Sequence, residues 1–142
     1  MRPLLATAVA LCSLSVLTAP ALAEPTITEF SAGITAGSEP RDIAAASDGT
    51  LWFTENALIG RLGRITTSGT VTEFSAGLTI GGGPWSIAPA SGGDMWFTEN
   101  ALLGSVGRTT LLGGVTQFTS GLTTGGQLRH IAEGPDDNLW AT

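Results

Sequence analysis

The chain is 142 residues long, with 20 Gly, 7 Pro and a formal net charge of −6. Charged residues make up 13% of it and only six are Lys or Arg, which excludes the basic surface of a nucleic-acid-binding protein and the charge patterns of a coiled coil or a charged disordered linker. The length suits one domain at most, and the many glycines and prolines favour turns over long helices.

Residues 1–23 have the pattern of a secretory signal peptide. Arg2 supplies the positive start, an apolar run follows, and Ala21-Leu22-Ala23 places small residues where cleavage requires them. The apolar run is shorter than the ~20 residues of a membrane-spanning helix, which disfavours an anchor. We therefore expect a secreted protein, extracellular or periplasmic, that consists of residues 24–142. It is not expected to associate with a membrane after cleavage, and Cys12, its only cysteine, leaves with the signal.

A repeat of 44 residues organises the rest of the chain. The segment Phe30-Ser31-Ala32-Gly33 recurs as Phe74-Ser75-Ala76-Gly77, and Trp52-Phe53-Thr54-Glu55 recurs as Trp96-Phe97-Thr98-Glu99, both at this interval. A third interval leads from Trp96 to Trp140. The repeats lie around residues 26–69, 70–113 and 114–142.

Each repeat contains about four short apolar runs bounded by Gly, Asp or Ser, and a further run at 26–30 precedes the first complete set. A period of about 40–45 residues with four strands is typical of a β-propeller blade. We predict an all-β fold of four-stranded antiparallel blades, with a lead-in strand at 26–30. The chain holds about two and a half blades and is expected to form an incomplete propeller.

The tryptophans are expected to serve packing. Side chains alternate across a strand, so Trp52 and Thr54 point to one face and Phe53 to the other. Trp52 and Trp96 then lie at equivalent positions and are each large enough to fill most of the gap between neighbouring blades.

Three elements of the repeat carry a family resemblance: Leu51–Asn56, Leu62-Gly63-Arg64-Ile65-Thr66 and Val71–Phe74. With these elements the repeat resembles that of the virginiamycin B lyase (streptogramin lyase) family of β-propeller proteins, and the resemblance extends over residues 27–140. It implies an antibiotic-resistance activity, the Mg²⁺-assisted elimination that opens the ring of type B streptogramins at its ester linkage. It also implies a histidine general acid or base in a Pro-His-x-Ile motif, with glutamates nearby.

That motif can be placed on this sequence, but its histidine is absent. The isoleucine anchors are Ile43, Ile87 and Ile131. The position two residues before each anchor should hold the histidine, and it holds Arg41, Trp85 and Arg129. His130, the only histidine, stands one residue late, and a one-residue slip in a strand turns a side chain to the opposite face. We therefore expect no catalytic, cofactor-binding or metal-binding residue, and no Mg²⁺ requirement, in this chain.

Other polar motifs are assigned structural roles. Glu55 and Glu99 belong to the repeated Trp-Phe-Thr-Glu element and are expected to form hydrogen bonds within each blade. Asp136-Asp137-Asn138 lacks the ligand spacing of a calcium loop and is expected to be a blade hairpin. Gly81-Gly82-Gly83 is expected to be a loop that does not bind phosphate.

Arg41, Trp85 and Arg129 are candidates for ligand contact, because they occupy equivalent positions near the face where the family binds its ligand. Two cations flanking an aromatic ring suit an anionic or aromatic partner, either a small molecule or a peptide. The alternative is that the arginines are solvated charges at strand starts.

A closed propeller needs about four to eight blades, so two and a half blades leave open faces at both ends. Three interpretations follow. The chain is a truncated, catalytically incompetent member of the family, or it is a non-catalytic ligand-binding or protein-interaction module that self-associates through its open blade edges. The third, an active lyase built by such assembly, is disfavoured because no copy supplies the Pro-His motif.

Overall fold

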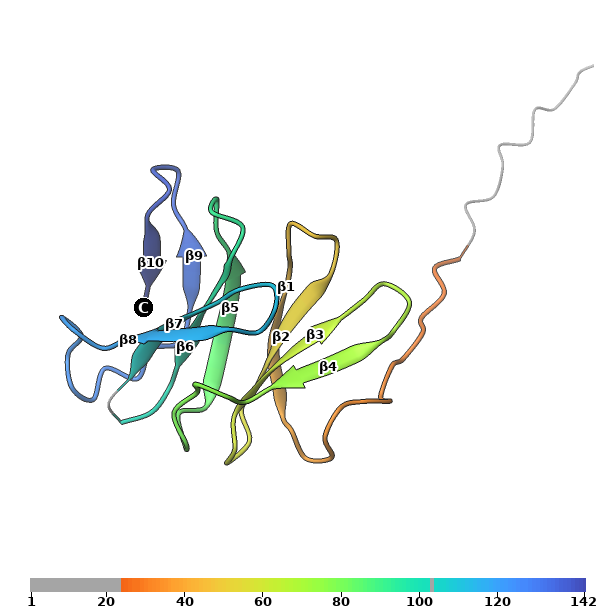
Figure 1. The fold of residues 1–142 in the computed structure, drawn as a ribbon, viewed down its shortest axis with the longest axis horizontal. Helices are drawn as coiled ribbons and strands as arrows, with labels where there is room; N and C mark the ends of the chain where they lie inside the picture. Colours follow the sequence, from red (N-terminus) through yellow and green to blue (C-terminus); the bar gives the residue numbers. More distant parts are fainter. Residues whose placement is uncertain (1–23, 103) are drawn as a thin grey trace, which may run out of the picture.

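The computed structural model describes residues 24–102 and 104–142, and the expected signal peptide lies outside them. The described residues form ten strands in three antiparallel sheets and contain no helix (Figure 1). It follows that no membrane-spanning helix is found in this part of the chain. The prediction of an all-β fold is confirmed.

The first blade is a four-stranded sheet whose strands follow one another in chain order. Its strands are β1 (Pro40–Ala45), β2 (Leu51–Glu55), β3 (Arg61–Ile65) and β4 (Val71–Phe74). The turn between β1 and β2 uses Asp48, whose carboxylate accepts hydrogen bonds from the backbone N–H and the hydroxyl of Thr50 at 3.0 and 2.6 Å. These bonds lower the pKa of Asp48.

The second blade repeats the first, and each of its strands begins 44 residues after its counterpart. Its strands are β5 (Pro84–Pro89), β6 (Met95–Glu99), β7 (Ser105–Thr109) and β8 (Val115–Phe118). The third sheet has two strands, β9 (Ile131–Glu133) and β10 (Leu139–Ala141). The hairpin that joins them contains Asp136, which accepts a hydrogen bond from the side-chain amide of Asn138 at 2.8 Å, as expected for a blade turn.

The predicted lead-in strand at 26–30 is not formed, since residues 24–30 belong to no strand. This segment is the repeat equivalent of β4 and β8, the outermost strands of the two blades. An outermost strand needs the third strand of its own blade as a hydrogen-bonding partner, and no such strand precedes it in the described residues. Phe30 nevertheless lies against Gly69, as Phe74 lies against Gly113 in the next repeat.

The main core lies between the first two blades. Trp52 is fully buried there, stacked on Phe74 with ring centroids 5.2 Å apart. The buried members of this cluster are Ala46, Trp52, Leu62, Ile87, Met95 and Phe97. The prediction that the tryptophan fills the space between blades is confirmed for Trp52. Burying an aromatic side chain of this size removes a large apolar area from water and stabilises the contact between the blades.

In each four-stranded blade, a phenylalanine ring of the second strand packs directly against a glycine of the third strand. Phe53 is paired with Gly63, and a Cβ atom at Gly63 would come within 2.0 Å of the ring. Phe97 and Gly107 repeat this arrangement in the second blade. The glycine in the Leu-Gly-Arg-Ile element is therefore required for packing.

Threonines at the same repeat position in the second strand of each four-stranded blade connect neighbouring sheets. The Thr54 hydroxyl accepts a hydrogen bond from the Asp42 N–H at 3.2 Å and donates one to the Trp85 carbonyl at 3.0 Å. Thr98 makes the same pair of contacts with Ser86 and Arg129. Both threonines are fully buried, so these bonds also satisfy backbone groups that water cannot reach.

Candidate functional site

The three candidate residues lie at or just before the starts of the innermost strands, with Arg41 in β1, Trp85 in β5 and Arg129 two residues before β9. We call this region the inner-strand rim (Arg41, Trp85 and Arg129). The pairing of β1 with β2 changes register between Pro40 and Ile43, and that of β5 with β6 changes between Pro84 and Ile87. A bulge of this kind re-aims the side chains it contains. Simple alternation of faces therefore does not hold at Arg41 and Trp85, and in the third repeat Arg129 and His130 precede β9 and belong to no strand.

The structure brings the three candidates into contact. The guanidinium carbon of Arg41 lies 4.9 Å from the ring centroid of Trp85, and that of Arg129 lies 4.6 Å from the same centroid. Both distances are within the range of a cation–π interaction. Since the residues are separated by 44 positions in the sequence, the cluster exists only where three blades meet.

The charges of the rim are partly compensated. Arg41 forms an ion pair with Glu39 at 3.0 Å, and both side chains are exposed. No ion pair is found for Arg129 among residues 24–102 and 104–142, and this side chain is also exposed. The rim therefore offers a cationic edge to solvent, with the half-buried indole of Trp85 behind it.

A small polar cavity of about 190 Å³ adjoins Trp85 on this side of the molecule. Its lining residues are Asn56, Ala57, Leu58, Gly81, Gly82, Gly83, Trp85 and Asn100. The side-chain amide of Asn56 donates to the Pro84 carbonyl at 3.3 Å, whereas the buried amide nitrogen of Asn100 has no partner in the described residues. An unpartnered buried donor of this kind can donate a hydrogen bond to an acceptor group of a bound molecule.

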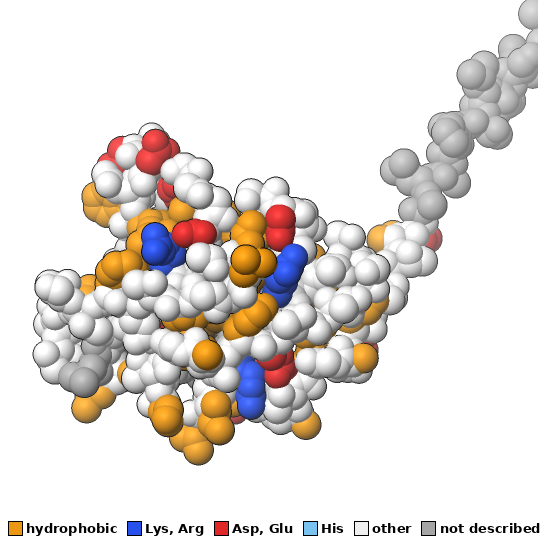
Figure 2. Space-filling view, in the orientation of Figure 1, with side chains coloured by type: hydrophobic (Ala, Val, Ile, Leu, Met, Phe, Trp, Pro, Cys, Tyr) orange, Lys and Arg blue, Asp and Glu red, His pale blue; other side chains and the backbone are white. Residues whose placement is uncertain are grey.

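Exposed aliphatic side chains stand on the loops beside this cavity. They are Leu58 at 83% exposure, Ile80 at 88% and Leu102 at 74%. Figure 2 shows apolar side chains projecting at the lower edge of the view, where Figure 1 places the β2–β3 and β4–β5 loops. The Leu58 and Ile80 loops are joined by a hydrogen bond from the Gly81 N–H to the Leu58 carbonyl at 3.3 Å.

The rim carries no group able to accept a proton at neutral pH. Arginine stays protonated and the indole N–H only donates, so neither residue type serves as a general base. His130 is exposed and occupies the repeat position of Asp42 and Ser86, one residue beyond the rim positions. The Ser86 hydroxyl donates to the Asp42 carboxylate at 2.7 Å, which places this position at the contact between blades.

The Asp42–Ser86 contact was missed from the sequence. Asp42 also accepts the Ile87 N–H at 2.9 Å, so one carboxylate oxygen connects the first inner strand to the second. The spacing of 44 between Asp42 and Ser86 was the available signal, since polar residues at one repeat position of adjacent blades are neighbours in space.

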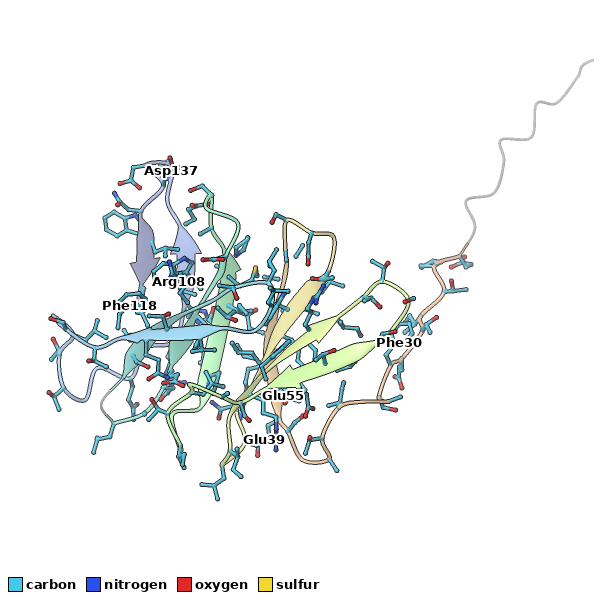
Figure 3. All side chains as sticks on the ribbon, viewed as in Figure 1. Phe30, Glu39, Glu55, Arg108, Phe118 and Asp137 are labelled. Atoms are coloured by element: carbon cyan, nitrogen blue, oxygen red, sulfur yellow. The ribbon has the colours of Figure 1, made fainter. Side chains whose placement is uncertain are left out.

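The repeated glutamates lie at the same end of the blades as the rim, and Figure 3 labels Glu55 there beside Glu39. Both Glu55 and Glu99 are fully buried. Glu99 accepts three hydrogen bonds and so has the structural role expected for it, whereas Glu55 has no hydrogen-bond partner in the described residues. In the same part of the chain, no three His, Cys, Asp or Glu side chains gather into a group that could hold a metal ion.

Comparison with known proteins gives a consistent family. The model of the Virginiamycin B lyase family matches residues 17–142. Selenomethionine-substituted virginiamycin B lyase from Staphylococcus aureus is similar in structure, with a TM-score of 0.69 and 35% identity over 76% of this chain and 36% of that one. No curated protein sequence matches the chain.

Two further solved structures are similar. One is a catalytically inactive virginiamycin B lyase from Staphylococcus aureus with quinupristin, with a TM-score of 0.68 and 32% identity over 77% of this chain and 36% of that one. The other is a streptogramin B lyase, with a TM-score of 0.67 and 28% identity over 77% of this chain and 35% of that one. The chain thus spans about a third of the length of the proteins that it matches.

Proposed function

Because the chain belongs to the virginiamycin B lyase family, we propose that it is a secreted propeller protein whose blades bind an anionic or aromatic ligand at the inner-strand rim without carrying the family's elimination chemistry. The single observation that supports this most is the Arg41–Trp85–Arg129 cluster, which stands where the resemblance requires a histidine. Two guanidinium groups over one indole attract a carboxylate and orient it, but they cannot remove a proton from carbon.

The surroundings of the cluster support a ligand with both an anionic and an apolar part. The cationic edge would hold the anionic group, and the exposed Leu58 beside the cavity would contact an aromatic or aliphatic group. A small aromatic acid or the carboxyl end of an apolar peptide has this chemistry.

Binding can be tested by NMR titration with N-acetylphenylalanine, with its uncharged amide as the matched ligand control. The carboxylate is expected to shift the Trp85 indole signal, and the amide to shift it less. R129Q should weaken binding on the order of tenfold, since a partly desolvated cation–π contact is lost together with a charge. R108Q is the control, because Arg108 is a partly exposed arginine of β7 that pairs with Asp94 and lies outside the rim. Equal effects of the two variants, or no shift with either ligand, would rule out the rim as the site.

The absence of elimination chemistry has its own test. After incubation with a type B streptogramin and Mg²⁺, mass spectrometry is expected to find no linear product of unchanged mass. If such a product forms, this part of the proposal is wrong. H130A is then expected to leave the activity intact, because His130 lies outside the position that the family motif requires. A large loss in H130A would show that the register placed on the motif is wrong.

Export can be tested separately. Expression of residues 1–142 in a bacterial host is expected to yield protein outside the cytoplasm whose first residue is Glu24. N-terminal sequencing measures this, and retention in the cytoplasm with Met1 intact would contradict secretion.

A second function, a self-associating module, is favoured by the face of the first blade that is turned away from the second blade. A cavity of about 340 Å³ lies there, lined by Phe30, Ile34, Pro40, Arg41, Asp42, Ile43, Phe53 and Ile65. One repeat later, the equivalent residues Phe74, Leu78, Ile87 and Phe97 pack around Trp52. Trp140 holds the same repeat position and is 64% exposed. We propose that Trp140 of a second copy occupies the cavity of the first blade.

Light scattering across a range of concentrations tests this association. The protein is expected to form dimers or longer assemblies, and W140S to shift the distribution toward monomer. A monomer at every concentration would exclude a second copy as the occupant and would leave a further blade of a longer chain in its place.

A further inference from the structure

Glu55 and Glu99 occupy equivalent repeat positions, but the groups around them differ in how many hydrogen-bond donors they supply. Glu99 accepts hydrogen bonds from the Thr79 N–H at 3.1 Å, the Ser105 hydroxyl at 2.6 Å and the Gln117 amide at 2.9 Å. Every one of these partners is a donor, so the ionised carboxylate of Glu99 is fully satisfied.

In the first blade two of those donors are replaced. Arg61 stands at the Ser105 position, and Glu73 stands at the Gln117 position. The Glu73 carboxylate accepts the Thr35 hydroxyl at 2.6 Å and pairs with Arg61 at 3.6 Å. The positive charge of Arg61 is therefore used by Glu73, and Glu55 faces a carboxylate where Glu99 faces an amide.

Within the part of the chain that the structure describes, Glu55 lacks the hydrogen-bond donors that a buried carboxylate needs. Its side chain is fully buried, and neither carboxylate oxygen has a donor in the described residues. A buried carboxylate without a donor, next to a second carboxylate, is costly in both solvation and repulsion. A proton on Glu55 removes both costs, because the acid can then donate to Glu73, which holds the repeat position from which Gln117 donates to Glu99 at 2.9 Å.

We propose that Glu55 and Glu73 form a proton-binding site in which one proton is held between the two carboxyl groups, with Glu55 as donor and Glu73 as acceptor. The groups that act on Glu55 come from three elements: Arg61 from β3, Glu73 from β4, and the Ser38 hydroxyl from the loop before β1. Glu39 in that loop turns to Arg41 instead. In the second blade the Gln117 amide is a permanent hydrogen-bond donor to Glu99. In the first blade the shared proton takes the place of that donor, and its presence depends on pH.

The direction of both pKa shifts agrees with this arrangement. Burial raises the pKa of Glu55 to about 7 and the neighbouring Glu73 carboxylate acts in the same direction, while the Ser38 hydroxyl and the Arg61 charge act to lower it without reversing the shift. Burial alone would also raise the pKa of Glu73, but its hydrogen bonds from Thr35, the proton of Glu55 and the charge of Arg61 together lower it. One carboxyl thus holds the proton and the other stays ionised, as in other close carboxyl pairs.

The consequence is a loss of stability as pH rises. The folded state binds the Glu55 proton more tightly than the unfolded chain, so its stabilising effect is complete below the ordinary pKa near 4.5 and disappears as pH rises toward 7. The unfolding equilibrium constant is expected to rise roughly fiftyfold between pH 5 and pH 8 from this site alone. Glu73 acts in a separate window, since its lowered pKa makes it lose stability only below about pH 4.5.

Urea unfolding of the full chain at pH 5 and pH 8 tests the proposal with a matched pair of variants. E55Q carries a permanent donor toward Glu73, so its stability should be nearly the same at both pH values. E99Q removes the acceptor of three hydrogen bonds, so it should be less stable at both pH values while keeping the pH dependence of the unaltered protein. If E55Q keeps the full pH dependence, the proposal is wrong.

A second measurement does not depend on the stability of a variant. Infrared spectra of the folded protein should contain the carbonyl band of a protonated carboxylic acid at pH 5, and this band should be gone at pH 8. E73Q should lose the band at pH 5, because a glutamine amide then donates to Glu55 as Gln117 donates to Glu99. Absence of the band in the unaltered protein, or its persistence in E73Q, would overturn the shared proton.

Discussion

Three tryptophans hold the same place in successive repeats and differ in what lies against them. Trp52 is covered by the four-stranded second blade and fully buried. Trp96 stacks on Phe118, belongs to the blade that is followed by a sheet of only two described strands, and is half-buried, while Trp140 is 64% exposed. The side chain is the same in each case, so the difference in burial reflects how much of each tryptophan is covered by the sheet that follows it.

Replacement of these tryptophans by alanine should therefore have graded effects. W52A is expected to lower the free energy of unfolding by about 3–5 kcal/mol, because a fully packed aromatic is removed and a cavity remains. W140A should change it by less than about 0.5 kcal/mol when it is measured at a concentration where the protein is monomeric, so that association through Trp140 does not contribute. Urea unfolding followed by circular dichroism measures both. A similar loss in the two variants would mean that the burial of Trp52 does not stabilise the fold.

The sequence predicts some of the site residues well and others poorly. Arg41, Trp85 and Arg129 could be chosen because the 44-residue period places them at one repeat position, and the structure brings them together. The difference between Glu55 and Glu99 could not be predicted from their shared Trp-Phe-Thr-Glu motif. It depends on which residues of the third and fourth strands face them, and that pairing requires the strand register.

At the scale of the strands, the 44-residue repeat predicts four strands per blade but does not predict the bulges within them. Four strands per repeat follow from the alternation of apolar runs and turn residues. The bulges between Pro40 and Ile43 and between Pro84 and Ile87 leave no such signal, because a bulge changes the pairing without changing the pattern of residue types. The segment 26–30 has the pattern of a strand but lacks the partner that would make it one.

The glycine beneath each phenylalanine gives a prediction for the strands. G63A is expected to lower the free energy of unfolding by about 1–3 kcal/mol, because its Cβ atom would lie 2.0 Å from the Phe53 ring. G92A is the control, since a Cβ atom there has no neighbour within 4 Å. Thermal unfolding of the two variants measures the difference. An unchanged midpoint in G63A would show that the ring moves aside at no cost.

The threonine between blades gives a second prediction. T54V keeps the shape of the side chain but leaves the Asp42 N–H and the Trp85 carbonyl without their partner, so a loss of about 1–3 kcal/mol is expected. T54S keeps the hydroxyl and should retain most of that stability. Chemical unfolding of both variants is the measurement, and equal losses would show that the methyl group, not the hydrogen bonds, holds the blades.

At the scale of the molecule, stability is expected to be uneven. Blades contact only their neighbours, so each sheet is stabilised by its own strands and by the faces next to it. The second blade has four strands and neighbours on both sides, while β9 and β10 have three residues each and a neighbour on one side.

Hydrogen exchange measured by mass spectrometry should follow that order. Amides of β9 and β10 are expected to exchange on the order of tenfold faster, or more, than those of β6. Uniform protection across the three sheets would contradict a stack of separately stabilised blades and would indicate one cooperative unit.

The inner-strand rim has a consequence for how this molecule would respond to a ligand. Arg41 lies in β1, Trp85 in β5 and Arg129 in the segment that leads into β9, so the cluster persists only while the three sheets keep their relative positions. A molecule that binds all three favours the packed arrangement over any arrangement in which the blades separate. Ligand binding at the rim and packing of the blades around Trp52 are therefore thermodynamically coupled. A ligand should raise the stability of the blade contact, and a variant that weakens this contact should lower the affinity for the ligand.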